Sequence, residues 1–447
     1  MLRTTVLLFL LGSLPVSLRA QSDPEELLRR AVTRINDTLD RLPKYMCTQT
    51  IERDQLRVPP NDRRRNPCDA RPSSSQLQLT HSDRLRLDVA STSTGEMYSW
   101  AGEGRFHDEE LYDMVRNGYI ASGGFSGFLG SVFGNQGTEF FYHGESRVEG
   151  RLLQEYAFGV SREKSQYWFG LPRHQEIVAF DGTFLVDPET ADLVRLVVNV
   201  KDPPPETGAC AATNTLEYGH THLRDADFLL PKEIRLEVMH PSGLEARNRT
   251  LFSGCHEFLG ESTLQFEAPD PARVSQPAAS APTVLDLPPG VPFRIALADD
   301  IDTGVAAAGD SVAAKLTSSI EDASHKVLLA AGTPVTVRIL QLERNYVHDG
   351  NQPGAAAVEL SMLFRVETAI VAGTARRIVA TADPVMRSFD KVRGALTQYR
   401  SLGTLETIMF DPGSAKFRFW NVPLHHVIKA GTESNWTTGR RGGRRSN

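Results

Sequence analysis

Residues 84–89 read Arg-Leu-Arg-Leu-Asp-Val, a strict alternation of polar and apolar side chains. Because successive side chains of a β-strand point to opposite faces of a sheet, Leu85, Leu87 and Val89 would share one apolar face. Similar short runs recur at 156–160, 166–169, 178–180, 183–186, 193–200 and 234–238. Many short strands separated by turns predict a mainly β fold built on an antiparallel sheet.

Two turns are predicted inside this region. Asp181-Gly182 stands between two apolar runs, which is a strong hairpin signal because glycine tolerates a positive φ. The segment 187–190, Asp-Pro-Glu-Thr, predicts a second turn before the apolar run at 193–200. Together the two turns predict a meander.

One amphipathic helix is predicted ahead of the strands. Asp23 is a typical N-cap, Pro24 suits the first helical position, and Glu26 follows the cap by three residues. Apolar residues then recur at helical spacing, at Leu28, Val32, Ile35, Leu39 and Leu42. Pro43 ends the predicted helix.

A second, shorter helix is predicted at 125–133. Its apolar side chains fall at i, i+3, i+4, i+7 and i+8 and form one face. The intervening glycines weaken the helix by up to about 1 kcal/mol each, so we expect it to depend on docking against an apolar surface. Two interpretations stay open: a lid over a ligand cavity, or a helix that completes the core. The candidate ligand-binding residues are Trp100, Phe125, Phe128, Leu129, Val132, Phe133, Tyr156 and Trp168.

Composition divides the mature chain. Residues 21–268 carry the first helix and the meander, and 269–283 are rich in Pro and Ala, which predicts an extended linker. Alternating runs after 284 predict a second, small all-β barrel or sandwich domain that ends near 430. A basic tail at 431–447 is expected to be disordered.

Residues 1–20 have the features of a cleaved signal peptide. Arg3 precedes an apolar run, and Ala20 offers the small residue that a signal peptidase needs. We therefore expect a periplasmic or secreted protein. No later stretch approaches the roughly 20 apolar residues of a transmembrane segment. A formal net charge of −6 gives no general electrostatic basis for binding nucleic acid.

Four cysteines remain after the leader: Cys47, Cys68, Cys210 and Cys255. An even count in an exported protein indicates disulfide bonds. Of the three possible pairings, Cys47 with Cys68 and Cys210 with Cys255 is favoured here, because each of these pairs would close a local loop that contains turn residues.

Motifs that carry catalysis or bind metals are incomplete. His220 and His222 would share one face of a strand, but a metal would need a third ligand, and only Asp225 or Asp227 is near in sequence. Residues 161–164 read Ser-Arg-Glu-Lys, without the Lys-Thr-Gly or Ser-Asp-Asn that accompany Ser-x-x-Lys in acylases of cell-wall peptides. The sequence thus predicts a protein without enzymatic activity, metal or cofactor.

Several segments together resemble a class of exported bacterial proteins of unassigned function: 45–53, 123–125, 180–190 with Arg195, and 228–231. The strands and turns at 180–195 are also similar to the half-barrel shared by the lipoprotein carrier LolA and the stress regulator RseB. This resemblance, over about 25–268, implies a curved antiparallel sheet packed by helices, whose concave apolar face holds acyl chains or a protein segment. Residues 284–430 are similar to TrbI-like β domains, which implies a role in binding partners.

The sequence therefore predicts a protein that binds an apolar ligand, namely a lipid, a lipoprotein acyl chain or an apolar peptide, under the helix at 125–133. The alternative is an envelope scaffold that contacts other envelope proteins through residues 284–430. A secreted hydrolase that uses unrecognised residues is the third interpretation.

Overall fold

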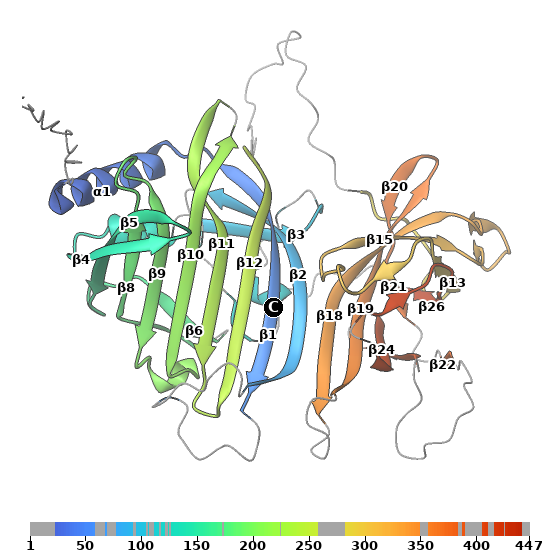
Figure 1. Ribbon diagram of the computed structural model, residues 1–447. Helices are drawn as coiled ribbons and strands as arrows, with labels where there is room; N and C mark the ends of the chain where they lie inside the picture. Colours follow the sequence, from blue (N-terminus) through green and yellow to red (C-terminus); the bar gives the residue numbers. More distant parts are fainter. Residues whose placement is uncertain are drawn as a thin grey trace, which may run out of the picture.

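The computed structural model describes residues 23–58, 68, 77–92, 95–103, 106, 111–115, 118–120, 124, 127–171, 174–223, 225–257, 282–348, 356–382, 387–388, 405–409, 415–423 and 425–439. The leader at 1–20, Phe125 and residues 269–281 of the predicted linker lie outside this set. The described chain is mainly β, with a large antiparallel sheet and few helices, as the alternation of the sequence predicts (Figure 1).

Helix α1 forms where the sequence predicts it, from Pro24 to Arg41. The Asp23 side chain accepts a hydrogen bond from the backbone N–H of Glu25, which satisfies one of the free donors of the first turn. Leu27, Ala31 and Ile35 make up its buried face. In Figure 1 this helix lies across one end of the large sheet, beside β5 and β9.

The first group of strands forms a continuous antiparallel ladder. Its order is β4-β5-β8-β9-β10-β11-β12-β1-β2-β3, so that the first strand of the chain lies between β12 and β2. The strands are β1 (Tyr45–Arg57), β2 (Gln78–Thr92), β3 (Gly95–Trp100), β4 (Glu139–Val148), β5 (Arg151–Val160), β8 (Phe180–Val186), β9 (Leu193–Lys201), β10 (Ala211–Leu223), β11 (Ala226–Met239) and β12 (Leu244–Glu257). Smaller elements are α2 (Leu111–Met114), α3 (Gly127–Phe133), η3 (Pro205–Thr207) and the hairpin of β6 (Trp168–Leu171) and β7 (His174–Ile177). The predicted meander is present from β8 onward.

One of the two predicted turns is wrong. Asp181 and Gly182 lie inside β8, where Gly182 pairs with Phe158 of β5 and Val198 of β9. A Cβ atom on Gly182 would lie 1.8 Å from the Val197 carbonyl oxygen, so glycine is needed here for close backbone approach rather than for a turn. The turn predicted at 187–190 is correct, because Asp187 accepts hydrogen bonds from the backbone N–H groups of Glu189 and Thr190.

The later strands surround a hydrophobic cluster of their own, which contains Phe293, Ile339, Met362 and Trp436. These strands are β13 (Pro292–Leu297), β14 (Ile301–Asp302), β15 (Ser311–Leu316), β16 (Ile320–Glu321), β17 (Val327–Leu329), β18 (Pro334–His348), β19 (Ala356–Val371), β20 (Thr374–Arg377), β21 (Ala380–Ala382), β22 (Arg387–Ser388), β23 (Leu405–Met409), β24 (Ala415–Val422), β25 (Val427–Ile428) and β26 (Glu433–Thr438). The prediction that the chain is disordered from residue 431 onward is wrong for residues 433–438. These residues form β26, which pairs with β13 and β21 and contains the buried Trp436.

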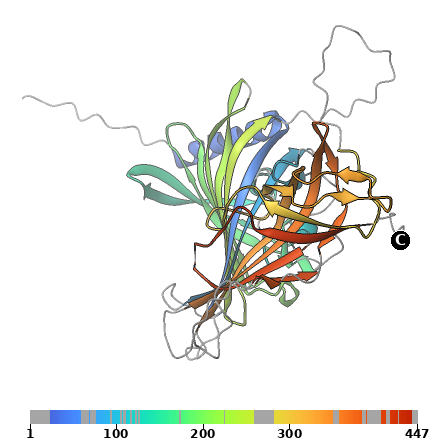
Figure 2. The same ribbon diagram turned by 90° about the vertical axis from the view of Figure 1, so that its right-hand side faces the viewer.

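The two groups of strands are joined by more than the chain between them. β18 pairs with β2, and this ladder places both groups in one sheet. Arg338, which is 3% exposed, donates hydrogen bonds to the backbone carbonyls of Ala101 and Gly309. Figure 2 shows the later strands in front of the first group, beside β2 and β3. Because of this ladder, an independent second domain from residue 284 stays a prediction.

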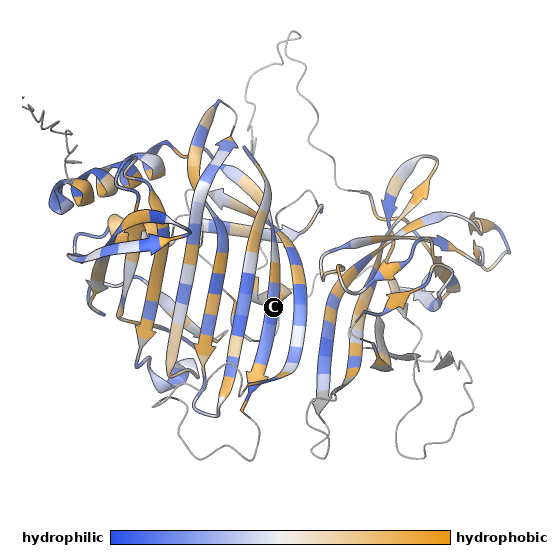
Figure 3. Ribbon diagram, viewed as in Figure 1, coloured by the Kyte–Doolittle hydropathy of each residue, from blue (hydrophilic) through white to orange (hydrophobic). Residues whose placement is uncertain are grey.

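Hydrophobic and hydrophilic bands alternate along the long strands of the first group, as Figure 3 shows. The apolar residues on one face of β5, β8, β9, β10 and β11 form the main core with α1 and α3. A separate cluster lies where β1, β2 and β3 meet and includes Tyr45, Leu87 and Trp100. The first group of strands therefore has two cores. One lies between the sheet and the helices α1 and α3, and the other lies at the junction with the later strands.

Candidate functional site

Helix α3 is the element that the sequence singles out as a lid, and it lies on the apolar face of the sheet. Its four apolar side chains, Phe128, Leu129, Val132 and Phe133, are all at most 5% exposed. The Asn36 side chain of α1 donates a hydrogen bond to the Phe133 carbonyl at 3.3 Å. The two helices thus cover the sheet side by side.

The space beneath α3 is filled with aromatic rings. Phe184 of β8 is fully buried at its centre, with ring centroids 5.0 Å from Phe133, 5.2 Å from Tyr156 and 5.8 Å from Phe140. The Phe128 ring meets Tyr167 edge to face at 5.2 Å. In this structure the side chains of α3 are therefore core residues, and a ligand could reach the face beneath them only if α3 moved.

The structure does not bring all the candidate residues together. Phe128, Leu129, Val132, Phe133 and Tyr156 belong to one cluster. Trp100 is buried in the other cluster of the first group, beside Leu87. Trp168 is 58% exposed on β6, and Phe125 lies outside the described residues. The seven candidate residues that the structure describes therefore do not form a single binding surface.

A small pocket opens where α3 and α1 meet the ends of the strands. It has a volume of about 260 Å³. Its apolar wall is formed by Ile35, Leu129, Ala191, Leu193, Ala226, Phe228 and Leu229, and its polar lining by Arg34, Thr38, Arg41, Asp192, His220 and Asp227. Leu129 is the one candidate residue that lines it. The pocket is thus apolar on one side and charged at the rim.

The charges at the rim are partly paired. Asp192 Oδ1 lies 2.6 Å from Arg34 Nε, and Asp192 Oδ2 lies 3.0 Å from His220 Nε2. Burial alone would raise the pKa of Asp192, but hydrogen bonds from His220, Arg34 and Thr190 hold it below its ordinary value. His222 instead contacts Asp227 at 2.9 Å. The two histidines thus bind different aspartates and do not share one site.

The predicted disulfide pairing is wrong, although all four cysteines are in disulfides. Cys47 pairs with Cys255, and Cys68 pairs with Cys210. The local-loop argument failed because β1 and β12, far apart in sequence, are neighbours in the sheet. Two disulfides are typical of proteins from an oxidising compartment. Among the described residues, no helix is both long enough and apolar enough to cross a bilayer.

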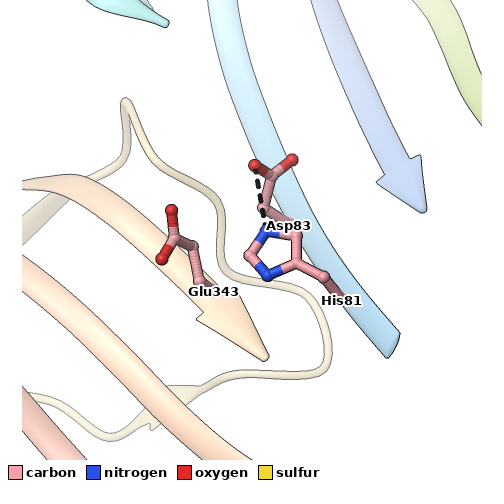
Figure 4. A group of neighbouring side chains, drawn as sticks. All are labelled: His81, Asp83 and Glu343. Carbon is pink, nitrogen blue, oxygen red and sulfur yellow. Dashed lines mark ion pairs between the residues drawn. The ribbon is translucent and has the colours of Figure 1, made fainter. Parts of the chain in front are cut away.

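Sequence reasoning missed a cluster of possible metal ligands at the junction of β2 and β18. One ligand atom from each of His81, Asp83 and Glu343 lies within 4.8 Å of the others. Figure 4 shows the three side chains. His81 and Asp83 share a face of β2, and their His-x-Asp spacing was the signal available in the sequence. Glu343 is far away in the chain and carried no signal.

Comparisons with solved structures give distant likenesses. A DUF1329 family protein from Desulfovibrio piger is 9% identical, with 54% of this chain and 96% of that chain covered and a TM-score of 0.26. An outer membrane lipoprotein-sorting protein domain from Vibrio parahaemolyticus is 7% identical, with 52% and 92% covered and a TM-score of 0.27. The MucA/MucB complex of Pseudomonas aeruginosa gives 13% identity, 91% and 99% coverage and a TM-score of 0.16.

No protein-family model matches this chain, and no curated protein matches it either. Because every TM-score quoted above lies below 0.5, these likenesses do not establish a shared fold. The resemblance of residues 284–430 to TrbI-like β domains stays a prediction.

Proposed function

We propose that this chain is a non-enzymatic protein of the periplasm or the exterior that binds an acyl chain, from a lipid or a lipoprotein, at the edge of α3. The observation that carries the proposal is the pocket of about 260 Å³ between α1, α3 and the strand ends. Leu129, Phe228 and Leu229 form part of its apolar wall, and Arg34 and Arg41 lie at its rim. This division suits a ligand with an apolar chain and an anionic end.

The size of the pocket implies that α3 moves when a ligand binds. Ligand pockets usually enclose about 300–1,000 Å³, so the present pocket holds only part of an acyl chain. Helix α3 has seven residues, including Gly127 and Gly130, which lower its intrinsic stability. A short helix of this kind separates from the sheet at lower cost than a strand in the ladder, because it breaks fewer hydrogen bonds.

Burial of the chain would supply the affinity. Each Å² of apolar surface removed from water contributes about 25 cal/mol. A chain that replaces α3 on the aromatic face offsets the contacts that the helix loses, and the part of the chain inside the existing pocket adds net affinity. Arg41 at the rim adds selectivity: it is exposed, and its Nε–H donates to the Asp37 carbonyl of its own helix. Its remaining N–H groups are placed to meet a carboxylate or phosphate.

The test compares two tryptophan variants of the full mature chain. Leu229→Trp fills the pocket from β11, whereas Leu152→Trp adds the same ring to an exposed position of β5 that is 38% exposed. We expect lipid in organic extracts of the purified protein by mass spectrometry, and binding of the fluorescent fatty acid cis-parinaric acid. Leu229→Trp should weaken this binding at least about tenfold, and Leu152→Trp should not change it. Absence of both lipid and fatty-acid binding in the natural sequence would overturn the proposal.

A second candidate function is contact with envelope proteins, and the edge strand β4 favours it. Among the described strands, β4 pairs with β5 alone, and it exposes Phe141 and Tyr142 to 58% and 45%. An open edge with exposed aromatic rings suits an added strand from a partner. The sequence-based alternative placed such contacts on residues 284–430 instead. Phe141→Lys should remove a co-purifying envelope protein without changing bound lipid, whereas loss of lipid alone would argue against this candidate.

A further inference from the structure

The β2–β18 ladder brings three ligand-type side chains from distant parts of the chain together. Glu343 is the direct partner of Asp83 in the ladder, and Asn345 is the partner of His81. Asp83 is 6% exposed, whereas His81 and Glu343 are partly exposed. In Figure 4 the His81 ring and the Asp83 carboxylate from β2 face the Glu343 carboxylate from β18.

The His81 ring is held in the tautomer that a metal ligand needs. Its Nδ1 lies 2.9 Å from the Asn345 Oδ1, and an amide oxygen can only accept a hydrogen bond, so Nδ1 carries the proton. In the neutral ring, which is the form that binds a metal, the lone pair is then on Nε2, which lies 3.9 Å from Asp83 Oδ2. A polar partner on the outer nitrogen is the usual support for a metal-binding histidine.

The Asp83 carboxylate is also oriented. Arg53 binds it with both Nε, at 2.7 Å from Oδ1, and Nη2. Each carboxylate oxygen has two lone pairs, so Asp83 can contact a metal ion while it stays bound to Arg53. The guanidinium charge balances one of the two carboxylates and weakens the site for any cation, but the second carboxylate leaves one uncompensated negative charge.

A pocket of about 300 Å³ gives access to this cluster. Its lining includes His81, Asp83 and Glu343 together with Arg53 and Asp54. The opening provides an entry path and room for water in the coordination positions that the protein leaves free. Asp54 adds a further carboxylate to the wall.

We propose that His81, Asp83 and Glu343 bind a divalent ion of the zinc class, which ties β2 to β18. One imidazole nitrogen with two carboxylate oxygens suits Zn²⁺, whereas Mg²⁺ and Ca²⁺ prefer oxygen ligands alone. Metal–ligand distances of about 2.1 Å imply ligand atoms about 3.4 Å apart in a tetrahedral site, which small side-chain rotations from the present spacing would reach. The ion would thereby strengthen the junction between the two groups of strands. This inference does not depend on the acyl-chain site.

The test uses the full chain after removal of metals with EDTA. Isothermal titration with Zn²⁺ should give one site per chain, and the thermal midpoint should rise with Zn²⁺ but not with Mg²⁺. His81→Gln and Glu343→Gln should each weaken Zn²⁺ binding at least about tenfold. Asn345→Leu, which removes the partner of Nδ1, should weaken it by about 10- to 100-fold, as is typical of such supporting residues.

His222→Gln is the matched control. His222 also contacts an aspartate, Asp227, at 2.9 Å, but it is exposed on β10 and belongs to no cluster of three ligand-type residues among those that the structure describes. This variant should bind Zn²⁺ like the natural sequence. Thermal midpoints of the metal-free variants check that each is folded. The proposal is overturned if Zn²⁺ does not bind at about 1 mM, if Mg²⁺ binds equally tightly, or if folded His81→Gln and Glu343→Gln keep full affinity.

Discussion

Cys47 of β1 and Cys255 of β12 form a disulfide although 208 residues separate them in the chain. The two strands are neighbours in the sheet, with Met46 opposite His256 and Thr48 opposite Ser253. The bond therefore fastens the first strand of the protein to the last strand of the first group. Every strand from β2 to β11 lies within the loop that it closes.

Removal of this disulfide should destabilise the protein substantially. We expect Cys47→Ala with Cys255→Ala to lower the free energy of unfolding by about 2–5 kcal/mol, because the long loop gains entropy in the unfolded chain. Urea denaturation with and without the double substitution measures this. Peptide mapping without reduction provides the check on connectivity: fragments that join Cys47 to Cys68 would contradict the structure.

Phe184 should be a major contributor to core stability. It is fully buried and contacts the rings of Phe133, Tyr156 and Phe140. Phe184→Ala should cost about 3–5 kcal/mol of unfolding free energy, since it leaves a cavity in the aromatic cluster. Phe141→Ala is the matched control, because Phe141 is 58% exposed and should cost less than about 1 kcal/mol. Equal losses in the two variants would show that the core lies elsewhere.

Two glycine substitutions should have opposite effects. A Cβ atom on Gly130 of α3 meets nothing within 4 Å, so Gly130→Ala should stabilise the helix by up to about 1 kcal/mol and slow fatty-acid uptake. Gly182→Ala should destabilise the protein by more than about 1 kcal/mol, because its Cβ would overlap the Val197 carbonyl oxygen. Thermal unfolding of both variants measures the difference. A stable Gly182→Ala protein would contradict the close packing of β8 on β9.

The buried Arg338 should contribute far more to the stability of the protein than an exposed arginine does. Its Nε lies 2.7 Å from Glu367 Oε1, and its side chain is 4% exposed. Arg338→Ala should cost about 3–5 kcal/mol, because the Glu367 carboxylate is left without this partner in a mostly buried position. Arg294→Ala, at an ion pair with side chains 55% and 42% exposed, should change stability by less than about 1 kcal/mol. Chemical denaturation compares them, and a near-neutral Arg338→Ala would argue against the junction described above.

His240 should make the protein less stable in mild acid. Burial lowers the pKa of His240, and a hydrogen bond with the Gly208 backbone only partly opposes this. The unfolded chain therefore takes up the proton more readily, and stability should fall as the pH drops below about 6.5. Unfolding measured at pH 7.5 and pH 5 should show a smaller loss in His240→Gln than in the natural sequence. An identical loss in both proteins would assign the acid sensitivity to other groups.

Local sequence signals predicted the local structure well. Asp23 and Pro24 begin α1 as predicted, and the Asp187 turn forms as its residue types indicate. Of the apolar positions that predicted α1, Ile35 is buried and Leu28, Val32 and Leu39 are partly buried, whereas Leu27 and Ala31 complete the buried face. The exception at Asp181-Gly182 is informative. Glycine is found both where φ is positive and where another backbone approaches closely, and only the neighbours of β8 distinguish the two cases.

The candidate site could be predicted only in part. The spacing of Phe128, Leu129, Val132 and Phe133 predicted a helix with one apolar face, and the structure buries that face. The sequence could not show that Phe140, Tyr156 and Phe184 fill the space beneath it, because these residues come from three other strands. Nor could it show that Trp100 belongs to a different cluster.

The sequence by itself determined the mainly β class, the two helices that cover the sheet, and the presence of disulfide-forming cysteines, because each depends on residue types within a short span. Only the tertiary structure decided which strands are neighbours. It therefore decided that Cys47 meets Cys255, that β26 belongs to the core of the later strands, and that Glu343 meets His81 and Asp83. Strand pairing is set by burial and backbone hydrogen bonds between distant segments. The alternation of residue types within one segment does not show which distant segment it pairs with.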